Sequence, residues 1–111
     1  MNKNDRLIIP LPGFQRVQLT PQVQAIVVER HTLPSASIEL VIKGGAAQDS
    51  AGKEGLSRLT ANLLKKGSGK YSADKFSFAV EVRGATIYVN AGYDSITISG
   101  EFLAKDVEFG L

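Results

Sequence analysis

Hydrophobic and polar positions change period several times along the chain, and each change predicts a different element. The segment VQAIVVER, from Val23 to Arg30, is rich in β-branched residues and predicts a mostly buried strand. After the turn HTLPS, every second residue of 36–43 is apolar and the residues between them are mostly polar. This alternation predicts a second strand. The first twenty residues are interrupted by prolines and a glycine, which indicates an extended arm or a short edge strand.

The clearest helical pattern is GLSRLTANLLKKGS, residues 55–68. Leucines recur there at i, i+3, i+7 and i+8, so they share one face of a helix, and we expect this face to pack in the core: Leu56, Leu59, Leu63 and Leu64. Lys65 and Lys66 suit the negatively polarised last turn, and Gly67 can end the helix. Glu54, an acidic side chain expected in the first turn, is explained by the helix dipole; the alternative is a displaced catalytic base.

Small residues dominate the preceding segment, Gly44 to Gly55, which predicts a loop. The loop is not a phosphate loop, because Gly52-Lys53 is followed by Glu54 and lacks the hydroxyl that holds magnesium.

Residues 72–84 are ambiguous from their local pattern. Ser72 suits a helix N-cap and Gly84 a helix end, yet four apolar residues alternate as in a strand, and this local pattern favours the strand: Phe76, Phe78, Val80 and Val82. Next, TIYVNA and SITISGEF flank Gly92-Tyr93-Asp94 and predict a hairpin.

The spacing of Leu103, Val107 and Leu111 predicts a further helix that begins near Lys105. No cap or breaker follows this pattern, so we expect the chain to be a fragment of a longer domain. The alternative is a short frayed terminal helix.

A length of 111 residues limits the chain to one domain, and with the unfinished last helix we expect a single partial domain, residues 1–111, with an N-terminal arm over 1–20. Of its 111 residues 13 are basic and 11 acidic, scattered along the sequence, so we expect no nucleic-acid partner. No apolar run approaches the roughly 20 residues of a membrane span, and the run from Leu7 to Pro10 is too short for a signal peptide. The chain has no cysteine and one histidine, His31. The compartment stays open, with bacterial periplasm or cytoplasm as the expectation.

The order of these elements resembles the first half of a domain in the pitrilysin and insulinase metallopeptidase family, which includes the mitochondrial processing peptidases. The resemblance covers about Val17 to Leu111, and its most specific pieces come in order and at the family's spacings: Gly44-Gly45, Asp49, the stretch GKEGL at 52–56, Gly67-Ser68, Tyr71-Ser72 and Arg83-Gly84-Ala85. It implies an α+β fold, an antiparallel-rich sheet with helices packed on one face, as in the first half of a LuxS/processing-peptidase-like α/β roll. It also implies that residues 72–83 form a helix.

The family's inverted zinc motif, His-x-x-Glu-His, would fall on Arg58, Ala61 and Asn62. Two imidazoles at i and i+4 share a helix face and can bind one zinc ion, while a carboxylate between them can accept a proton from bound water. Arg58 is a permanent cation, Ala61 has no base, and Asn62 is a poor zinc ligand. The resemblance places His31 in the turn between two strands, away from this helix. We therefore expect no catalytic residue and no metal in this chain, with zinc only in a catalytic partner or domain.

In catalytic members the strand after the second helix offers an open edge to extended peptides, by main-chain pairing. By resemblance this peptide-binding edge is Ile87, Tyr88 and Val89, where bulky residues replace the family's small or polar ones.

The implied function is that of a non-catalytic subunit or lobe, which encloses a peptide substrate beside a homologous zinc-bearing partner. One alternative is an inactive domain of a single-chain zinc metalloendopeptidase whose active site lies in another domain. A second alternative is a stand-alone α+β interaction module. We expect the isolated chain to expose apolar surface and to self-associate. The sequence lacks the glycine-rich loop of the non-catalytic mitochondrial subunit, which favours a bacterial-type member.

Overall fold

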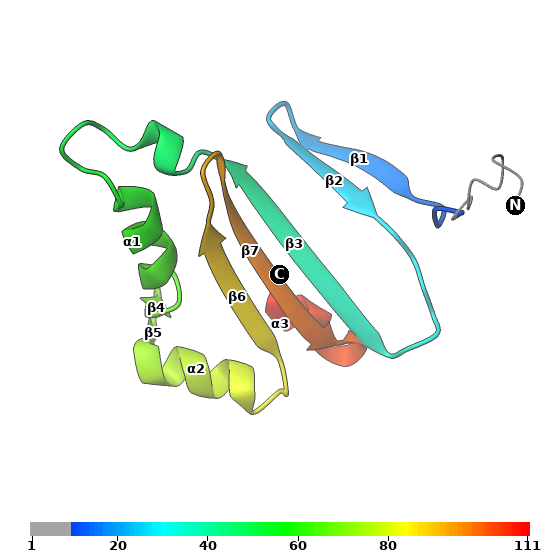
Figure 1. Cartoon of the computed structure of the whole chain (residues 1–111). Coiled ribbons are helices and arrows are strands. Elements are labelled where there is room, and N and C mark those ends of the chain that lie inside the picture. Colours follow the sequence, from blue (N-terminus) through cyan, green and yellow to red (C-terminus); the bar gives the residue numbers. More distant parts are fainter. Residues whose placement is uncertain (1–9) are drawn as a thin grey trace, which may run out of the picture. The chain divides into compact units, whose positions relative to one another are not determined.

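The structure is a computed structural model that describes residues 10–111. The first nine residues, which carry most of the run from Leu7 to Pro10, lie outside the described part. The chain divides into two compact units, residues up to Leu33 and residues Pro34–Leu111 (Figure 1). No helix in the described residues is long and apolar enough to cross a membrane.

The elements follow one another in an order of strands, helices and short 3₁₀ turns. They are β1 (Gln15–Thr20), β2 (Val23–Val27), β3 (Ser35–Lys43), η1 (Ala46–Gln48), α1 (Leu56–Leu63), β4 (Gly67–Ser68), β5 (Tyr71–Ser72), α2 (Ala73–Glu81), β6 (Thr86–Ala91), β7 (Ser95–Leu103), η2 (Ala104–Asp106) and α3 (Val107–Gly110).

The first unit contains one antiparallel hairpin, β1 with β2, in which Gln15 lies opposite Val27. Thr20 closes its tight turn, because its hydroxyl accepts hydrogen bonds from the backbone N–H groups of Gln22 and Val23. The segment predicted as an extended arm or a short edge strand thus ends in a strand. β2 stops at Val27 rather than at Arg30, and it is mostly exposed rather than mostly buried.

The second unit is built on a three-stranded antiparallel sheet in the order β3-β7-β6. Gly100 on the central strand lies between Ile38 of β3 and Ile87 of β6. A Cβ atom at Gly100 would lie 2.5 Å from the Phe102 ring, so the glycine makes room for that ring on the sheet.

The core of this unit lies where α2 and α3 meet the sheet. Val80 of α2, Ala85 and Phe102 are buried together, and Phe102 is only 5% exposed. Arg83 ties the two helices to each other, since its guanidinium donates to the carbonyl of Ala79 and lies 3.9 Å from the ring centroid of Phe109. The α+β class and the antiparallel sheet are therefore as predicted.

Residues 73–81 form a helix, which confirms the helix implied by the family resemblance, and the strand favoured by local alternation is wrong. Ser72 is the N-cap and accepts a hydrogen bond from the Lys75 backbone N–H. The alternating pattern gave the wrong element because the apolar residues of this segment do not share one buried face. Val80 is buried, whereas Phe78 is 67% exposed and Val82 is 63% exposed.

The leucine face of α1 is not in the core, which corrects the prediction. Its leucines are between 42% and 56% exposed and form what we call the leucine surface: Leu56, Leu59, Leu63 and Leu64. The buried residue of α1 is instead Ala61, at 2% exposure. At 3.6 residues per turn, Leu59 and Leu63 lie about 160° around the helix from Ala61. The periodicity identified a shared face, but the sheet lies on the other side of the helix.

The ends of α1 also differ from the prediction. The helix ends at Leu63, so Lys65 and Lys66 lie beyond its last turn. Gly67 begins β4 with φ +126°, and a Cβ atom there would lie 2.6 Å from the carbonyl oxygen of Tyr71.

Candidate functional site

The loop after β3 sets the position of α1 by docking on the turn between β6 and β7. Three backbone N–H groups of the loop donate to this turn: Gly44 to Asp94 at 2.9 Å, Ala46 to Gly92 at 3.1 Å and Ala47 to Tyr93 at 2.8 Å. Between them Gly45 is buried, and a Cβ atom there would come within 3.0 Å of three backbone atoms of the turn. Only glycine fits this contact.

Asp49 then fixes the start of α1 from six residues before the helix N-cap. The N-cap residue Gly55 has no side chain that could cap the helix, and the Asp49 carboxylate caps it instead. It accepts hydrogen bonds from the backbone N–H groups of Gly55 and Ser57 and from the Ser57 hydroxyl. These hydrogen bonds hold the pKa of Asp49 below its ordinary value, and the bond from the Ser57 hydroxyl has the largest effect. Capping rules look for an acceptor directly before the helix, so sequence analysis missed this role.

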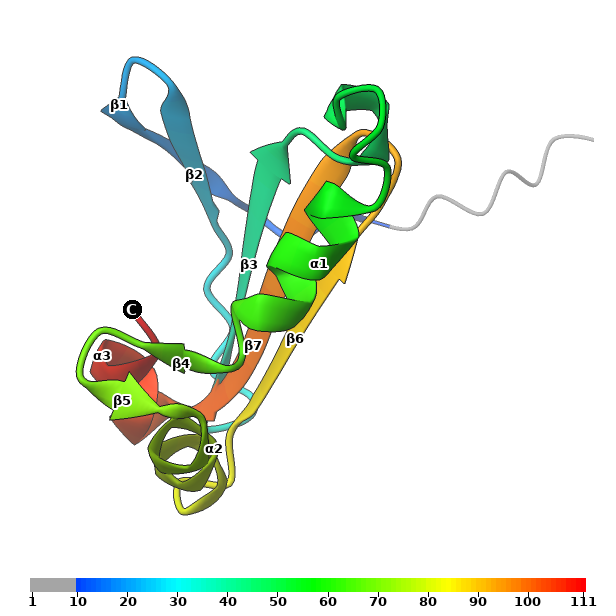
Figure 2. The ribbon, with the colours of Figure 1, turned by 90° about the vertical axis from the view of Figure 1, so that its left-hand side faces the viewer.

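Helix α1 packs against β6 (Figure 1) and lies in front of the face of the sheet in Figure 2. Ala61, which is the position of the motif's base, is the residue buried on this helix, while Arg58 and Asn62 are exposed. The small side chain of Ala61 lets the helix approach closely.

Two residues considered as a metal ligand or a catalytic base, His31 and Glu54, make ordinary surface interactions in the structure. His31 lies between β2 and β3, as expected, and its Nε2 is 3.8 Å from the Glu29 carboxylate, with both side chains largely exposed. Glu54 lies before the helix rather than in its first turn. Its carboxylate accepts a hydrogen bond from the Gly52 backbone N–H, which lowers the pKa of Glu54. The dipole explanation of Glu54 is thus replaced by a bond within the loop.

The predicted peptide-binding residues lie on β6, which pairs with β7 alone and is an edge of the described sheet. Ile87 and Val89 lie on the apolar face, opposite Gly100 and Ile98, and Ile87 packs against the core. Tyr88 lies on the other face and is 63% exposed. The structure thus keeps the three residues on one edge strand but turns their side chains to both faces.

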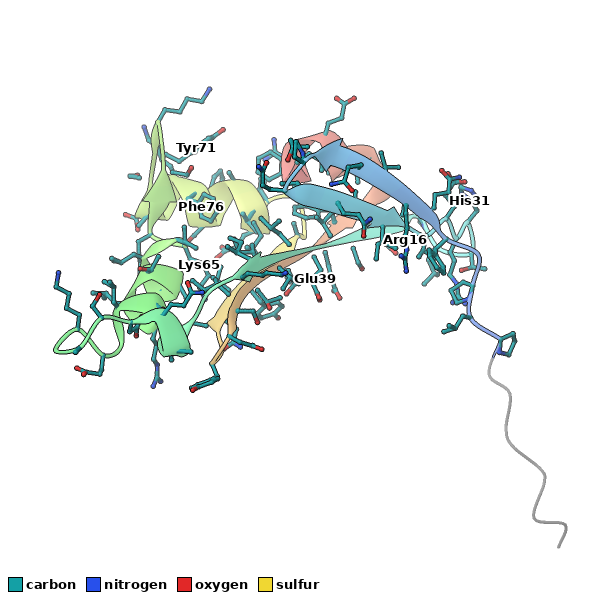
Figure 3. All side chains as sticks on the ribbon, turned by 90° about the horizontal axis from the view of Figure 1, so that it is seen from above. Arg16, His31, Glu39, Lys65, Tyr71 and Phe76 are labelled. Carbon is teal, nitrogen blue, oxygen red and sulfur yellow. The ribbon has the colours of Figure 1, made fainter. Side chains whose placement is uncertain are left out.

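A cavity of about 250 Å³ borders the first half of β6, and we call it the β6 cavity. Buried or half-buried apolar residues form its floor: Phe76, Val80, Ala85 and Ile87. Exposed Lys65 and Glu81 lie on its rim, and Figure 3 shows Lys65 beside Phe76. Tyr88 lines this cavity and Val89 does not. Sequence analysis missed it, because its walls come from α2, β6 and the segment after α1.

A comparison with protein families identifies the chain. Residues 25–110 match the family described as Insulinase (Peptidase family M16). The chain belongs to this insulinase family.

Two proteins from Helicobacter pylori resemble this insulinase-family chain. The chain is 30% identical over 99 residues to the non-peptidase homolog YmxG of strain ATCC 700392 / 26695. The aligned region covers 84% of this chain and 23% of that protein. It also resembles the crystal structure of a protease from Helicobacter pylori, with a TM-score of 0.80 and 19% sequence identity. This match covers 90% of this chain and 24% of the protease chain. The chain thus spans about a quarter of the length of these relatives. The family and the fold inferred from the order of elements are both confirmed.

The motif positions of α1 do not fit the zinc ion of the catalytic members. Arg58 carries a positive charge, Ala61 is buried without a basic atom, and Asn62 is a neutral amide. Within residues 10–111 no three histidine, aspartate or glutamate side chains lie close enough to hold a metal ion. The absence of a bound metal in this chain stays a prediction.

Proposed function

We propose that this chain is a non-catalytic part of a two-part peptidase and encloses a peptide beside a zinc-bearing subunit or domain of the same family. The motif face of α1 carries this proposal. The helix lies beside the edge strand β6, yet Arg58, Ala61 and Asn62 stand where two ligands and a base are required. Such a helix can line a peptide channel while the bond is cleaved on the partner. The name of the relative YmxG, a non-peptidase homolog, agrees with this role.

The peptide binds along β6 by main-chain hydrogen bonds. An edge strand has unpaired N–H and C=O groups on one side, and an extended peptide satisfies them with little dependence on its sequence. The first half of β6 is the accessible part, since it borders the β6 cavity.

The leucine surface of α1 is the proposed contact with the partner. Contiguous exposed apolar residues are typical of surfaces that bind other proteins. Three of its leucines are about half exposed in the described residues, at 48%, 54% and 56%: Leu56, Leu59 and Leu63.

A mixing experiment tests the proposal. The chain is combined with a purified family member that carries an intact His-x-x-Glu-His motif, and cleavage of fluorogenic peptides is measured. We expect the mixture to cleave faster than the catalytic protein alone, and a chelator to abolish the activity. Peptide hydrolysis by this chain alone, abolished by a chelator, would contradict the proposal.

A matched pair of variants assigns the contact. Leu59→Lys charges the leucine surface, whereas Leu103→Lys charges a leucine of similar exposure on β7. We expect the first to lose the gain on mixing and the second to keep it. Equal behaviour of the two variants would remove the leucine surface from the contact.

A further inference from the structure

Strand β3 is the edge of the three-stranded sheet opposite β6, and within residues 10–111 it pairs with β7 alone (Figure 1). Two hydrogen bonds just beyond its ends show which of its residues face β7. The Gly44 backbone N–H donates to the Asp94 carbonyl, and the Pro34 carbonyl accepts from the Ala104 N–H. Backbone groups of successive strand residues point to opposite sides. Even-numbered residues of β3 therefore bind β7, and odd-numbered ones point their N–H and C=O groups outward.

The second half of β3 is apolar and exposed. Leu40, Val41 and Ile42 are 48%, 56% and 43% exposed. Glu39 precedes them and Lys43 follows them, and both charged residues are also exposed. Outward-pointing backbone groups beside exposed apolar side chains are typical of a strand edge that pairs with another chain.

The segment ELVIK, residues 39–43, is complementary to itself. When a second copy pairs with it antiparallel about a two-fold axis at Val41, Glu39 of each copy lies opposite Lys43 of the other. Leu40 of each copy then lies opposite Ile42 of the other. Because residues 39, 41 and 43 point their backbone groups outward, this pairing forms about six main-chain hydrogen bonds. Opposite side chains share a face of the sheet, so the ion pairs lie on one face and the apolar pairs on the other.

Other positions of the two-fold axis fit the charges less well. An axis at Glu39 sets two glutamates opposite each other, and like charges in this position are destabilising. An axis at Leu40 or at Ile42 sets Val41 opposite a charged residue. An axis between two residues sets outward-pointing groups opposite groups that are bound to β7, so no ladder forms. The charges therefore favour the axis at Val41.

We propose that a second copy of this chain binds at the free edge of β3, with residues 39–43 of the two copies paired antiparallel about Val41. The two three-stranded sheets then form one continuous sheet. This inference goes beyond the proposed function, because it needs neither a peptide nor a zinc-bearing partner. The contact is also separate from the leucine surface, which lies on α1, the helix packed against β6.

Charge reversal tests the pairing and its register. Sedimentation equilibrium measures the dimer dissociation constant, with Leu59→Lys present in every chain so that the leucine surface does not contribute. Glu39→Lys sets lysine opposite lysine, and Lys43→Glu sets glutamate opposite glutamate. Each variant alone should raise the dissociation constant about tenfold or more, because both pairs change from attraction to repulsion. An equimolar mixture of the two variants restores opposite charges at both pairs and should dimerise like the chain without charge reversal.

Glu101 gives the matched control. It is exposed on β7 and lies opposite Ser37, so it shares a face of the sheet with Glu39 but lies on the central strand. Glu101→Lys should keep the dimer, and it should not restore dimerisation when mixed with Lys43→Glu. Circular dichroism verifies that all variants fold alike. If the mixture of Glu39→Lys with Lys43→Glu associates no better than each variant alone, the proposal is wrong.

Hydrogen exchange in the same Leu59→Lys chain tests the edge directly. The outward-pointing amides of Glu39, Val41 and Lys43 should become more protected as the chain concentration rises. The Leu40 and Ile42 amides, which face β7, should be protected at every concentration. A chain that stays monomeric would overturn the proposal. Outward-pointing amides protected equally at every concentration would also overturn it, because the edge would then be covered within a single chain.

Discussion

Replacing Gly45 with alanine should detach the loop that holds α1 beside the sheet. Gly45 has φ −176°, an extended conformation that alanine adopts equally well, so the effect comes from the added methyl group alone. That Cβ atom would lie 2.6 Å from the Gly92 carbonyl oxygen, 2.8 Å from that of Tyr93 and 2.9 Å from the Ser95 nitrogen. All three are backbone atoms and cannot rotate away.

The magnitude follows from the shift required. An ordinary contact begins at 3.4 Å, so the loop must move by 0.8 Å, which is 3.4 minus 2.6. Its three hydrogen bonds to the turn, now 2.8–3.1 Å long, would then exceed the normal range. Each contributes about 0.5–1.5 kcal/mol, and overpacking typically costs about 1–3 kcal/mol. We expect Gly45→Ala to lower the free energy of unfolding by about 2.5 kcal/mol or more.

Urea denaturation followed by circular dichroism measures this loss, and hydrogen exchange of the Gly44, Ala46 and Ala47 amides locates it. Gly92→Ala is the matched control on the other side of the same contact, since its Cβ atom would meet its nearest neighbour at an ordinary 3.4 Å. That variant should change the stability by less than about 0.5 kcal/mol. A Gly45→Ala chain as stable as the unmodified one, or an equal loss in Gly92→Ala, would refute the reasoning.

Four further predictions concern the cap, the core, metal and self-association. The lowered pKa of Asp49 means that its stabilisation is fully present above its ordinary value of 3.8 and is lost as the pH falls through the lower folded value. The urea midpoints of the unmodified chain and of Asp49→Asn should accordingly differ at pH 7 and converge in acid, and a gap that persists below this range would contradict the cap. Phe102→Ala should cost about 3–5 kcal/mol because the ring is only 5% exposed, whereas Phe78→Ala, at 67% exposure, should leave the urea midpoint nearly unchanged. Metal analysis of the purified chain should find no stoichiometric zinc, and about one zinc per chain would overturn the assignment of the motif positions. In sedimentation the chain should self-associate through its exposed leucines, and a clean monomer at high concentration would contradict this.

The candidate site was only partly predictable from sequence. The empty motif positions follow from residue identity once the family order is recognised, because arginine, alanine and asparagine lack the required donor atoms wherever they lie. The edge position of β6 also agrees with the family resemblance. The β6 cavity was not foreseen, because its walls join residues from Lys65 to Tyr88 that no local pattern relates.

The sequence by itself determined most of the elements and their order, from local periodicity, glycine placement and the family resemblance. The residues at the motif positions also predict that α1 carries no zinc chemistry. Only the tertiary structure decided that Ala61, and not the leucines, faces the sheet, and that Asp49 caps a helix six residues away. The physical reason is that periodicity shows which residues share a face, whereas burial and long-range hydrogen bonds depend on what the rest of the chain places opposite that face.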